Sequence, residues 1–357
     1  MLNVDAEADR RDFTVRAALD VADGDRVALF GPSGAGKTTV LEVIAGLVAP
    51  GRGRVELGGR VLTSTGTAAG TAAPTVAVPP WLRRVGLLRQ DPGLFPHLSV
   101  RANLTYARSS SAGGRAGGTE LAEIASSLGI DGLLAAMPAR LSGGQRHRVA
   151  LGRLLLAHCD ALLFDEPFAS LDAALRRSLT ALVKDLSSQR SVPSVLVTHQ
   201  LSDAQAFADR LLVMDRGAIL QAGAPDEVVL RPASRRVAEL VGYLGFVPVT
   251  WSDGGGSGVG GSGLTAVGEA GVVAGVHPDR VVPGADPVRG LVVTGTVTAA
   301  RPSGAGWEAD VSVGDAAFTC RLPSRPLGAE LSVTVLDPPY FGRAGTLLAP
   351  DINARYE

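Results

Sequence analysis

The segment GPSGAGKT, residues 31–38, limits the possible folds of this chain more than any other part of its sequence. It follows the apolar run RVALF, which favours a strand, and it leads into KTTVLEVIAGL, which has the apolar spacing of a helix that ends near Gly46. A glycine loop between a strand and a helix points backbone N–H groups and the positive end of the helix at one place, which suits phosphate. Lys37 would then reach the β- and γ-phosphates of a nucleotide, and the Thr38 hydroxyl would hold Mg²⁺. The predicted phosphate cradle comprises Gly31, Pro32, Ser33, Gly34, Ala35, Gly36, Lys37, Thr38 and Thr39.

Two apolar runs further along the chain end in side chains that suit phosphate chemistry. The run ALLF has the composition of a buried strand and is followed by Asp165 and Glu166. Asp165 is suited to hold Mg²⁺ through water, and Glu166 is suited to polarise an attacking water. The second run, VLVT, is followed by His199. Because ligands of open α/β sheets bind at the carboxyl ends of the strands, we expect His199 to contact the γ-phosphate.

A third motif, LSGGQ at residues 141–145, opens another helix. Ser142 is a preferred N-cap residue, and Gly143 and Gly144 allow close approach to the backbone. The following QRHRVALGRLLLAH continues as a helix, so its N-terminus would attract an anion. By itself this motif is also compatible with an ordinary helix start.

In this order, the motifs resemble those of the ATP-binding subunits of ABC transporters over about the first 240 residues. The resemblance implies an α/β P-loop NTPase core, the ABC ATPase, which hydrolyses ATP to ADP and phosphate with Mg²⁺. It also implies that Ser142, Gly143, Gly144 and Gln145 contact the γ-phosphate of ATP held by a second copy, in a head-to-tail dimer. The catalytic residues expected on this basis are Glu166, His199 and Lys37.

Three smaller elements extend the resemblance. Gln90 matches the family's glutamine that meets Mg²⁺ and the attacking water, so the expected metal-binding residues are Thr38, Gln90 and Asp165. The segment Ser170-Leu171-Asp172 matches the loop through which the two subunits sense each other. Phe13 stands where the family often has an aromatic ring stacked on adenine, but a phenylalanine in a strand is equally compatible with the core.

Two residues depart from the family pattern. Arg89 precedes Gln90 where a neutral residue is common, and His147 replaces a usual glutamine. We expect both to lie away from the chemistry and to alter the surface offered to a membrane partner.

Composition restricts the partners and the compartment. The formal net charge of −1 provides no basic field for a nucleic acid. Cys159 and Cys320 lie far apart, which predicts free thiols in a reducing cytoplasm. The N-terminus lacks the apolar core of a signal peptide, and no apolar run reaches the ~18 residues of a membrane span. We therefore expect a peripheral protein on the cytoplasmic side of the plasma membrane, attached to permease subunits.

Changes in composition also divide the chain. SDGGGSGVGGSG is typical of a flexible linker, and LVVTGTVTAA, WEADVSV, AAFTCRL and ELSVTVL then alternate as strands of a small antiparallel barrel. We predict an ABC ATPase domain over residues 1–240, a linker over 241–263 and an OB-like all-β barrel over 264–357. Within the first domain we predict a helical subdomain at about 92–140. Residues 63–80 are expected to form a surface excursion.

The barrel resembles the TOBE- or Mop-like accessory domain of importer ATPases, with GVHPDRV similar to its entry segment. This implies an importer, whose solute-binding protein outside the membrane is an indirect partner. The segment 83–107 together with the glycine loop is most similar to molybdate importers, which implies molybdate or a related oxyanion as cargo. Relatives that move sulfate, sugars, polyamines or iron share these features and remain alternatives.

Two further alternatives concern function outside transport. An oxyanion bound to the barrel would need basic residues such as Arg301, Arg321 and Arg325, although arginines on a barrel are usually solvated. A cytosolic ABC ATPase of DNA repair or translation is disfavoured, because the sequence shows neither a long coiled coil nor a second ATPase half.

Overall fold

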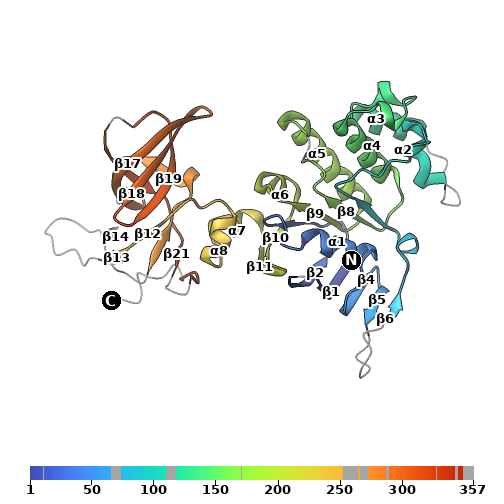
Figure 1. The fold of residues 1–357 in the computed structure, drawn as a ribbon, viewed down its shortest axis with the longest axis horizontal. Helices are drawn as coiled ribbons and strands as arrows, with labels where there is room; N and C mark the ends of the chain where they lie inside the picture. Colours follow the sequence, from blue (N-terminus) through green and yellow to red (C-terminus); the bar gives the residue numbers. More distant parts are fainter. Residues whose placement is uncertain are drawn as a thin grey trace. The chain divides into compact units, whose positions relative to one another are not determined.

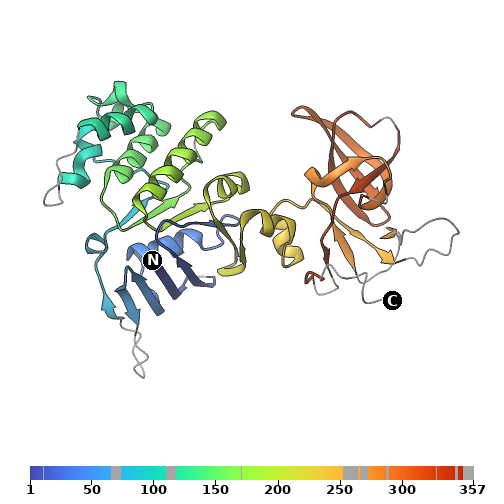
Figure 2. The ribbon, with the colours of Figure 1, turned by 180° about the vertical axis from the view of Figure 1, so that it is seen from behind.

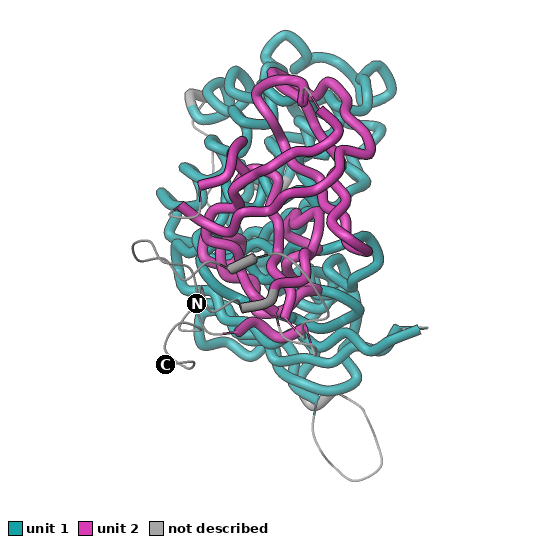
Figure 3. Tube along the Cα trace, turned by 90° about the vertical axis from the view of Figure 1, so that its left-hand side faces the viewer, with its two compact units in different colours: residues 1–225 teal, residues 226–357 magenta. Residues whose placement is uncertain are grey.

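The computed structural model describes residues 1–10, 12–65, 74–109, 118–169, 171–251, 264–265, 272–286, 289–326, 328–341 and 345–348. The chain forms two compact units, residues 1–225 and 226–357, which Figure 3 shows in different colours. Residues 252–263 of the predicted linker and residues 110–117 of the predicted helical subdomain lie outside the described residues.

The first unit is built on a six-stranded sheet in the order β11-β10-β3-β9-β8-β7. All neighbours pair in parallel except β10 and β11. Every residue of β8 and β9 is buried, as expected for strands covered on both faces. In Figures 1 and 2, helix α1 lies on one side of this sheet and α5 and α6 lie on the other. The strands are β3 (Arg26–Phe30), β7 (Val85–Leu88), β8 (Ala161–Asp165), β9 (Ser194–Thr198), β10 (Arg210–Asp215) and β11 (Ala218–Gly223).

A second sheet of five strands, in the order β2-β1-β4-β5-β6, completes the core of this unit. Its buried apolar side chains and those of α1 form one cluster with residues of β3, β8, β9 and β10. Strands β5 and β6 occupy both ends of the predicted surface excursion at 63–80. Thr63 is buried, so the prediction was wrong at that residue, whereas Val76 and Ala77 are exposed. The strands are β1 (Leu2–Asp9), β2 (Thr14–Val21), β4 (Arg52–Leu57), β5 (Arg60–Thr65) and β6 (Pro74–Ala77).

The helices of the first unit separate into two groups. Helices α2, α3 and α4 gather at the end of the unit away from the five-stranded sheet, and α2 and α3 both contact α4 (Figure 1). Helix α1 ends where the sequence predicts, because Gly46 follows it with a φ of 80° and its N–H bonds to the last turn. The helices are α1 (Lys37–Ala45), α2 (Val100–Ser109), α3 (Gly118–Ser127), α4 (Gly143–Leu156), α5 (Ala173–Arg190) and α6 (Leu201–Phe207), with short 3₁₀ turns η1 (Pro80–Leu82), η2 (Asp131–Leu133) and η3 (Pro138–Arg140).

The second unit is mainly antiparallel β-structure, as expected for an OB-like domain. Strand β17 pairs with β18 and β20, β18 pairs with β19, and β20 pairs with β16. Inward-facing apolar side chains of these strands form a separate buried cluster. The strands are β12 (Phe246–Pro248), β13 (Thr250–Trp251), β14 (Leu264–Thr265), β15 (Val273–Gly275), β16 (Val281–Pro283), β17 (Leu291–Ser303), β18 (Gly306–Val313), β19 (Ala316–Leu322), β20 (Glu330–Val335) and β21 (Tyr340–Phe341).

The boundary between the units differs from the sequence-based division. The second compact unit starts at residue 226, so helices α7 (Pro225–Leu230) and α8 (Arg235–Leu240) largely belong to it. Strand β12 falls inside the predicted linker 241–263, yet it pairs with β15 and its Val247 is fully buried. Leu244 also accepts a hydrogen bond from Thr319 N in β19. These residues are packed against the barrel because apolar side chains, which a linker lacks, find partners there. The predicted entry segment 275–281 runs from the end of β15 to the start of β16 and contains the 3₁₀ turn η4 (Pro278–Arg280).

Candidate nucleotide-binding site

The parallel strands bring the predicted site residues to one edge of the six-stranded sheet. Phe30 of β3 pairs with Thr198 of β9, and Asp165 of β8 pairs with Val197. The residues that directly follow these strands are therefore neighbours: Gly31 after β3, Glu166 after β8 and His199 after β9. Each of these residues directly follows a parallel strand in the sequence, so the sheet brings them together at one edge, as the motif order predicts.

The glycine loop between β3 and α1 is held by close backbone contacts. A Cβ added to Gly31 would lie 2.0 Å from the carbonyl oxygen of Met214, so no other residue fits there. Gly36 is the N-cap of α1 with a φ of 100°, and a Cβ there would lie 2.7 Å from Cγ2 of Val15. The loop residues Pro32, Ser33, Gly34 and Ala35 lie between these two points.

Lys37 lies over this loop. Its Nζ donates to the carbonyl oxygens of Gly31 and Pro32, both at 2.8 Å. The side chain is buried, and this burial lowers the pKa of Lys37, while the charges of Glu166 and Asp165 oppose that shift. The ammonium group of Lys37 therefore lies at the glycine loop before α1, where a phosphate would bind.

Thr38 and Asp165 form an oxygen-rich pair beside Lys37. The Thr38 hydroxyl donates to both carboxylate oxygens of Asp165, at 3.1 and 3.0 Å. Burial is the main cause that raises the pKa of Asp165, and the charges of Glu166 and Glu42 add to it, while the hydrogen bond from Thr38 opposes it. A buried carboxylate and a hydroxyl at hydrogen-bond distance are ligands that Mg²⁺ prefers, so these residues fit the predicted metal role.

Glu166 and His199 form a second pair. His199 Nδ1 lies 3.0 Å from Glu166 Oε1. Glu166 has a φ of 51°, a left-handed conformation that is unusual for a residue with a long side chain. Its N–H donates to the carbonyl oxygen of Val197, which fixes the backbone there. Strain of this kind is found where a side chain must be aimed at a site.

The remaining predicted site residues fall into three groups. Gln90 is exposed just after β7, whose Leu88 pairs with Phe164 of β8, so it lies at the same sheet edge as Asp165. Thr39 is buried in the first turn of α1. Phe13 is half-buried, and its ring lies 3.4 Å from the position of a Cβ on Gly36. That places the ring beside the start of α1, next to the core cluster.

Ser142 and Gln145 build the N-terminus of α4 as the motif predicts. The Ser142 hydroxyl accepts from Gln145 N at 3.2 Å, and Gln145 Oε1 accepts from Ser142 N at 2.8 Å, a complete capping box. A Cβ added to Gly143 would meet no atom within 4 Å. Gly144 follows in the first turn of the same helix. The motif therefore faces open space.

Asp172 is the N-cap of α5, where its carboxylate accepts from Ala174 N and Leu175 N at 3.1 and 3.0 Å. These backbone hydrogen bonds, led by the one from Leu175, lower the pKa of Asp172. Ser170 lies outside the described residues.

The two departures from the family pattern are placed differently. His147 is 6% exposed, so the expectation that it alters a surface is wrong. Burial lowers the pKa of His147, and a hydrogen bond with the Pro167 backbone opposes this. Arg89 is exposed, and its Nη2 lies 3.6 Å from Glu42 Oε1.

Sequence reasoning missed Glu42 and Arg10 near this site. Arg10 donates from Nε to the Thr39 hydroxyl and from Nη2 to Glu42 Oε2, both at 2.8 Å. Glu42 follows Thr38 by four residues, so the two share a helix face, and this spacing is the one signal that could have indicated it.

Two of the three arginines considered for an oxyanion on the barrel are paired with acids. Arg301 contacts Glu308 and Asp310 at 3.3 and 2.7 Å. Arg321 contacts Asp279 and Glu308 at 2.6 and 3.6 Å. Arg325 lies over the Trp307 ring, 5.4 Å from its centroid.

Cys159 and Cys320 are free thiols, and burial raises the pKa of each to about 11.

Comparisons with known proteins agree with this geometry. Residues 15–169 match the family model described as ABC transporter. The chain is 39% identical over 237 residues to the Fe(3+) ions import ATP-binding protein FbpC of Mesorhizobium japonicum, covering 66% of this chain and 63% of the relative. It is 38% identical over 237 residues to the trehalose/maltose import ATP-binding protein MalK of Thermococcus litoralis, covering 66% and 61%. It is 39% identical over 236 residues to the molybdenum import ATP-binding protein ModC of Mesorhizobium japonicum, covering 66% and 61%.

The chain thus spans somewhat less than two thirds of the length of these curated relatives. Among solved structures it resembles the dimeric post-hydrolysis state of the ATP-binding cassette MJ0796 bound to ADP and Pi, with a TM-score of 0.53 and 23% identity, covering 63% of this chain and 99% of that one. It also resembles a bacterial Atm1-family ABC exporter with ATP bound, with a TM-score of 0.53 and 25% identity, covering 67% of this chain and 41% of that one. No helix in the described part of the chain is long and apolar enough to cross a membrane. The first unit therefore has the P-loop fold of ABC ATPases, and the chain is similar to the ATP-binding subunits of ABC importers.

Proposed function

We propose that this chain is the ATP-hydrolysing subunit of an ABC importer. One observation supports this above all: Lys37, the Thr38–Asp165 pair and the Glu166–His199 pair meet at a single sheet edge. A cation, ligands for Mg²⁺ and a general base are the groups that phosphoryl transfer to water requires.

Binding of the triphosphate rests on α1 and the loop before it. Backbone N–H groups of the loop and the N-terminus of α1 attract the phosphates, and Lys37 exchanges its carbonyl partners for phosphate oxygens. Thr38 and Asp165, with Gln90 at the same edge, would hold Mg²⁺, which when bound neutralises charge that develops on the phosphate oxygens. Phe13 lies at the start of α1, where its ring would stack on the adenine.

Hydrolysis rests on the second pair. The Glu166 carboxylate accepts a proton or hydrogen bond from the attacking water and so orients it in line with the γ-phosphate. The hydrogen bond with His199 fixes the Glu166 carboxylate and the imidazole ring relative to each other. When Nδ1 donates to Glu166, Nε2 can donate to a γ-phosphate oxygen only if the imidazole carries a proton on both nitrogens.

A second copy of the chain would complete the site. Gly143 has open space around its Cα and a neighbouring capping box, so packing inside this chain does not require a glycine there. Close approach of a ligand or of another chain does require one. We infer that the Ser142–Gln145 segment contacts ATP held by the other copy, and that Asp172 lies at the junction of the two.

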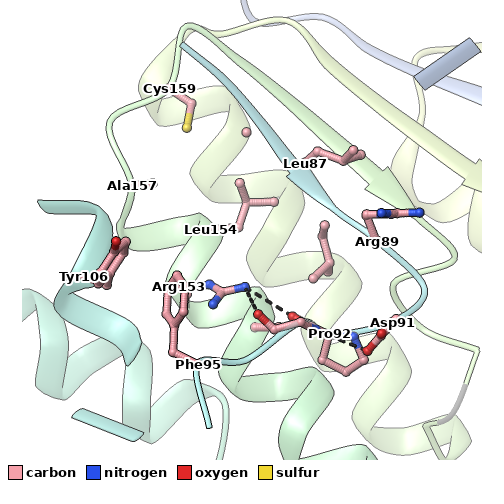
Figure 4. Close-up of a pocket in the computed structure, with 14 residues that line it drawn as sticks. Leu87, Arg89, Asp91, Pro92, Phe95, Tyr106, Arg153, Leu154, Ala157 and Cys159 are labelled. Carbon is pink, nitrogen blue, oxygen red and sulfur yellow. Dashed lines mark hydrogen bonds between the residues drawn. The ribbon is translucent and has the colours of Figure 1, made fainter. Parts of the chain in front are cut away.

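The membrane partner would dock beside the segment that follows β7. A cavity of about 410 Å³ lies there, between β7, α2 and α4 (Figure 4). Arg153 of α4 reaches into the same region, where its Nη2 donates to the carbonyl oxygens of Pro92 and Gly93 at 3.2 and 3.0 Å. The rings of Phe95 and Tyr106 pack against each other beside it, tilted by 44° with 4.3 Å between their centroids. A permease helix in this cavity would move with Gln90, and would hold the chain at the cytoplasmic face of the plasma membrane.

The first test measures Mg²⁺-dependent ATP hydrolysis by the purified chain. We expect turnover by the wild type and a loss of about 100-fold or more in Lys37→Ala, because removing one well-placed donor to a developing charge has at least this effect. A wild-type chain that hydrolyses no ATP, or a Lys37→Ala variant with normal turnover, contradicts the proposal.

A mixing experiment tests the shared site. Ser142→Arg and Lys37→Ala should each be inactive alone, but a mixed dimer keeps one site with an intact loop from one copy and an intact Ser142 segment from the other. An equimolar mixture should regain up to about a quarter of wild-type turnover if pairing is random and the sites act independently. No recovery at all contradicts sharing between copies.

For the cargo we propose molybdate or a related oxyanion, supported only by the similarity of segment 83–107 to molybdate importers. Relatives of like identity are named for iron, sugar and sulfate import, so the test must compare cargos directly. Deletion of the gene should reduce molybdate uptake by cells and leave uptake of iron, sulfate and trehalose unchanged. A loss confined to one of the other solutes assigns that cargo instead.

A further inference from the structure

Glu42 of α1 contacts two arginines that come from different parts of the nucleotide site. Its Oε2 accepts from Arg10 Nη2 at 2.8 Å, and its Oε1 lies 3.6 Å from Arg89 Nη2. The Glu42 side chain is 18% exposed, whereas those of Arg10 and Arg89 are 36% and 60% exposed. One half-sheltered carboxylate thus bridges two cations, and each of its oxygens has its own partner.

The Arg10 side of this bridge belongs to the turn that carries Phe13. Arg10 N donates to the Phe13 carbonyl oxygen at 2.9 Å, which closes the turn between β1 and β2. Arg10 Nε also donates to the Thr39 hydroxyl at 2.8 Å, in the first turn of α1. The turn beside the proposed adenine position is therefore attached to the phosphate-binding end of α1.

The Arg89 side belongs to the segment that leads to Gln90. Arg89 directly follows β7, and Figure 4 shows it just beyond the end of that strand. Strand β7 pairs in parallel with β8, so this segment lies next to Asp165 and Glu166.

Resting on the proposed ATPase function, we propose that Glu42 is a positioning residue that joins the turn carrying Phe13 and the segment carrying Gln90 to the nucleotide helix through Arg10 and Arg89. Arg10 positions the groups that bind ATP. Arg89 positions the groups that meet the attacking water. Glu42 keeps the two in fixed register with Lys37 and Thr38, so the binding and hydrolysis geometries depend on one carboxylate.

This role differs from an ordinary contribution to stability. Exposed ion pairs add little to the free energy of unfolding, so loss of these contacts should hardly change the melting temperature. Misplacement of a group near reacting atoms, in contrast, changes rate constants even when the fold is intact. The effect is therefore expected in KM and kcat, and it should divide between them according to which arginine is removed.

The test uses the full chain with Arg10→Gln, Arg89→Gln, Glu42→Gln and their double variants. Arg10→Gln should raise KM for ATP, and the Kd of a fluorescent ATP analogue, about threefold or more, with kcat nearly unchanged. Arg89→Gln should lower kcat about threefold or more with KM nearly unchanged, and Arg89→Lys, which keeps the cation, should recover part of kcat. Glu42→Gln should do both, and adding Arg89→Gln to it should lower kcat no further.

The matched control is Glu56→Gln. Glu56 is 24% exposed and accepts from Arg54 Nη2 at 2.8 Å on strand β4, so it is an ion pair of similar exposure and length that contacts none of the site residues above. A Glu42→Gln variant whose KM, kcat and Kd equal those of Glu56→Gln overturns the inference. The inference is also wrong if the effects of Arg10→Gln and Arg89→Gln do not separate, or if the losses only follow a lower melting temperature.

Failure of the proposed function gives a different result. A wild-type chain without turnover contradicts the ATPase proposal, and the Kd of Arg10→Gln against that of Glu56→Gln then still decides whether Arg10 acts on nucleotide binding. A wild-type chain with turnover and an unaffected Glu42→Gln contradicts the bridge alone.

Discussion

The candidate site of the first unit and the surface of the barrel in the second unit hold their charged side chains in opposite ways. At the candidate nucleotide site of the first unit, Lys37 and Asp165 are nearly inaccessible, 5% and 6% exposed. Burial lowers the pKa of Lys37 and raises that of Asp165, and both shifts favour the neutral form. On the barrel, Arg301 and Arg321 are 52% and 54% exposed and each contacts two carboxylates. Burying charges as in the first arrangement costs free energy of folding when no ligand is bound, whereas exposed ion pairs as in the second cost little.

This difference indicates where ligands act on the chain. Buried ionic groups held by few partners are typical of sites whose ligand supplies the missing charge. Charges that already have exposed partners would have to give them up before an oxyanion could bind. The comparison therefore favours chemistry in the first unit and gives no support to an oxyanion site at Arg301 and Arg321.

The largest difference between the two units should appear in kcat, when one carboxylate is replaced in each unit and the two variants are compared. Glu166→Gln keeps the size of the side chain and removes its ability to accept a proton, so kcat should fall by about 100-fold or more while ATP binding persists. Glu308→Gln, of similar exposure on the barrel, should leave kcat unchanged. Steady-state ATPase assays measure both, and light scattering should detect ATP-bound dimers of Glu166→Gln. Normal hydrolysis by Glu166→Gln would show that another group is the base.

A smaller effect is expected on stability. Because burial raises the pKa of Asp165, the folded state holds its proton more tightly than the unfolded state, and stability is lost as pH rises through the folded pKa. Asp165→Asn stays neutral, so without Mg²⁺ and nucleotide it should melt about 2–4 °C above the wild type at pH 7. The difference should disappear as pH falls toward about 4, the ordinary pKa of an aspartate. Calorimetry in a chelator between those pH values checks this, and a lower melting temperature at pH 7 would contradict it.

The smallest effect should follow from Arg321→Ala. Its partners Asp279 and Glu308 are exposed or near the surface, so the melting temperature should change by less than about 2 °C and ATP hydrolysis should not change. Calorimetric titration of the full chain with molybdate, tungstate and sulfate extends this test. Binding that Arg321→Ala abolishes would show that the ion pairs of the barrel do open for a ligand.

Much of the candidate site could be predicted because each part is encoded locally. The glycine loop, the acid pair and His199 each follow a short apolar run, and parallel strands necessarily end at one edge. The capping box of Ser142 and Gln145 also follows from four consecutive residues. The antiparallel β-structure of the second unit was predicted from alternating residues and turn signals, whereas the P-loop fold of the first unit was implied by the resemblance of its motifs to those of ABC ATPases.

Other features could not be predicted because they join residues that are distant in sequence. Arg10 and Glu42 are separated by 32 positions, and neither belongs to a motif. The placement of β12 inside a predicted linker depends on pairing with β15, and the short segment shows no clear alternation. The neutralisation of Arg321 depends on Asp279, which is 42 positions away.

The sequence by itself determined which chemical groups stand at the strand ends of the first unit, because a loop, a strand end and a helix cap are each specified by a few adjacent residues. Tertiary structure alone decided which charges are buried and which are partnered, since burial and ion pairing depend on the elements that pack around a side chain. For this reason the sequence did not indicate that Arg301 and Arg321 of the barrel are paired with acids, or that Glu42 contacts both Arg10 and Arg89.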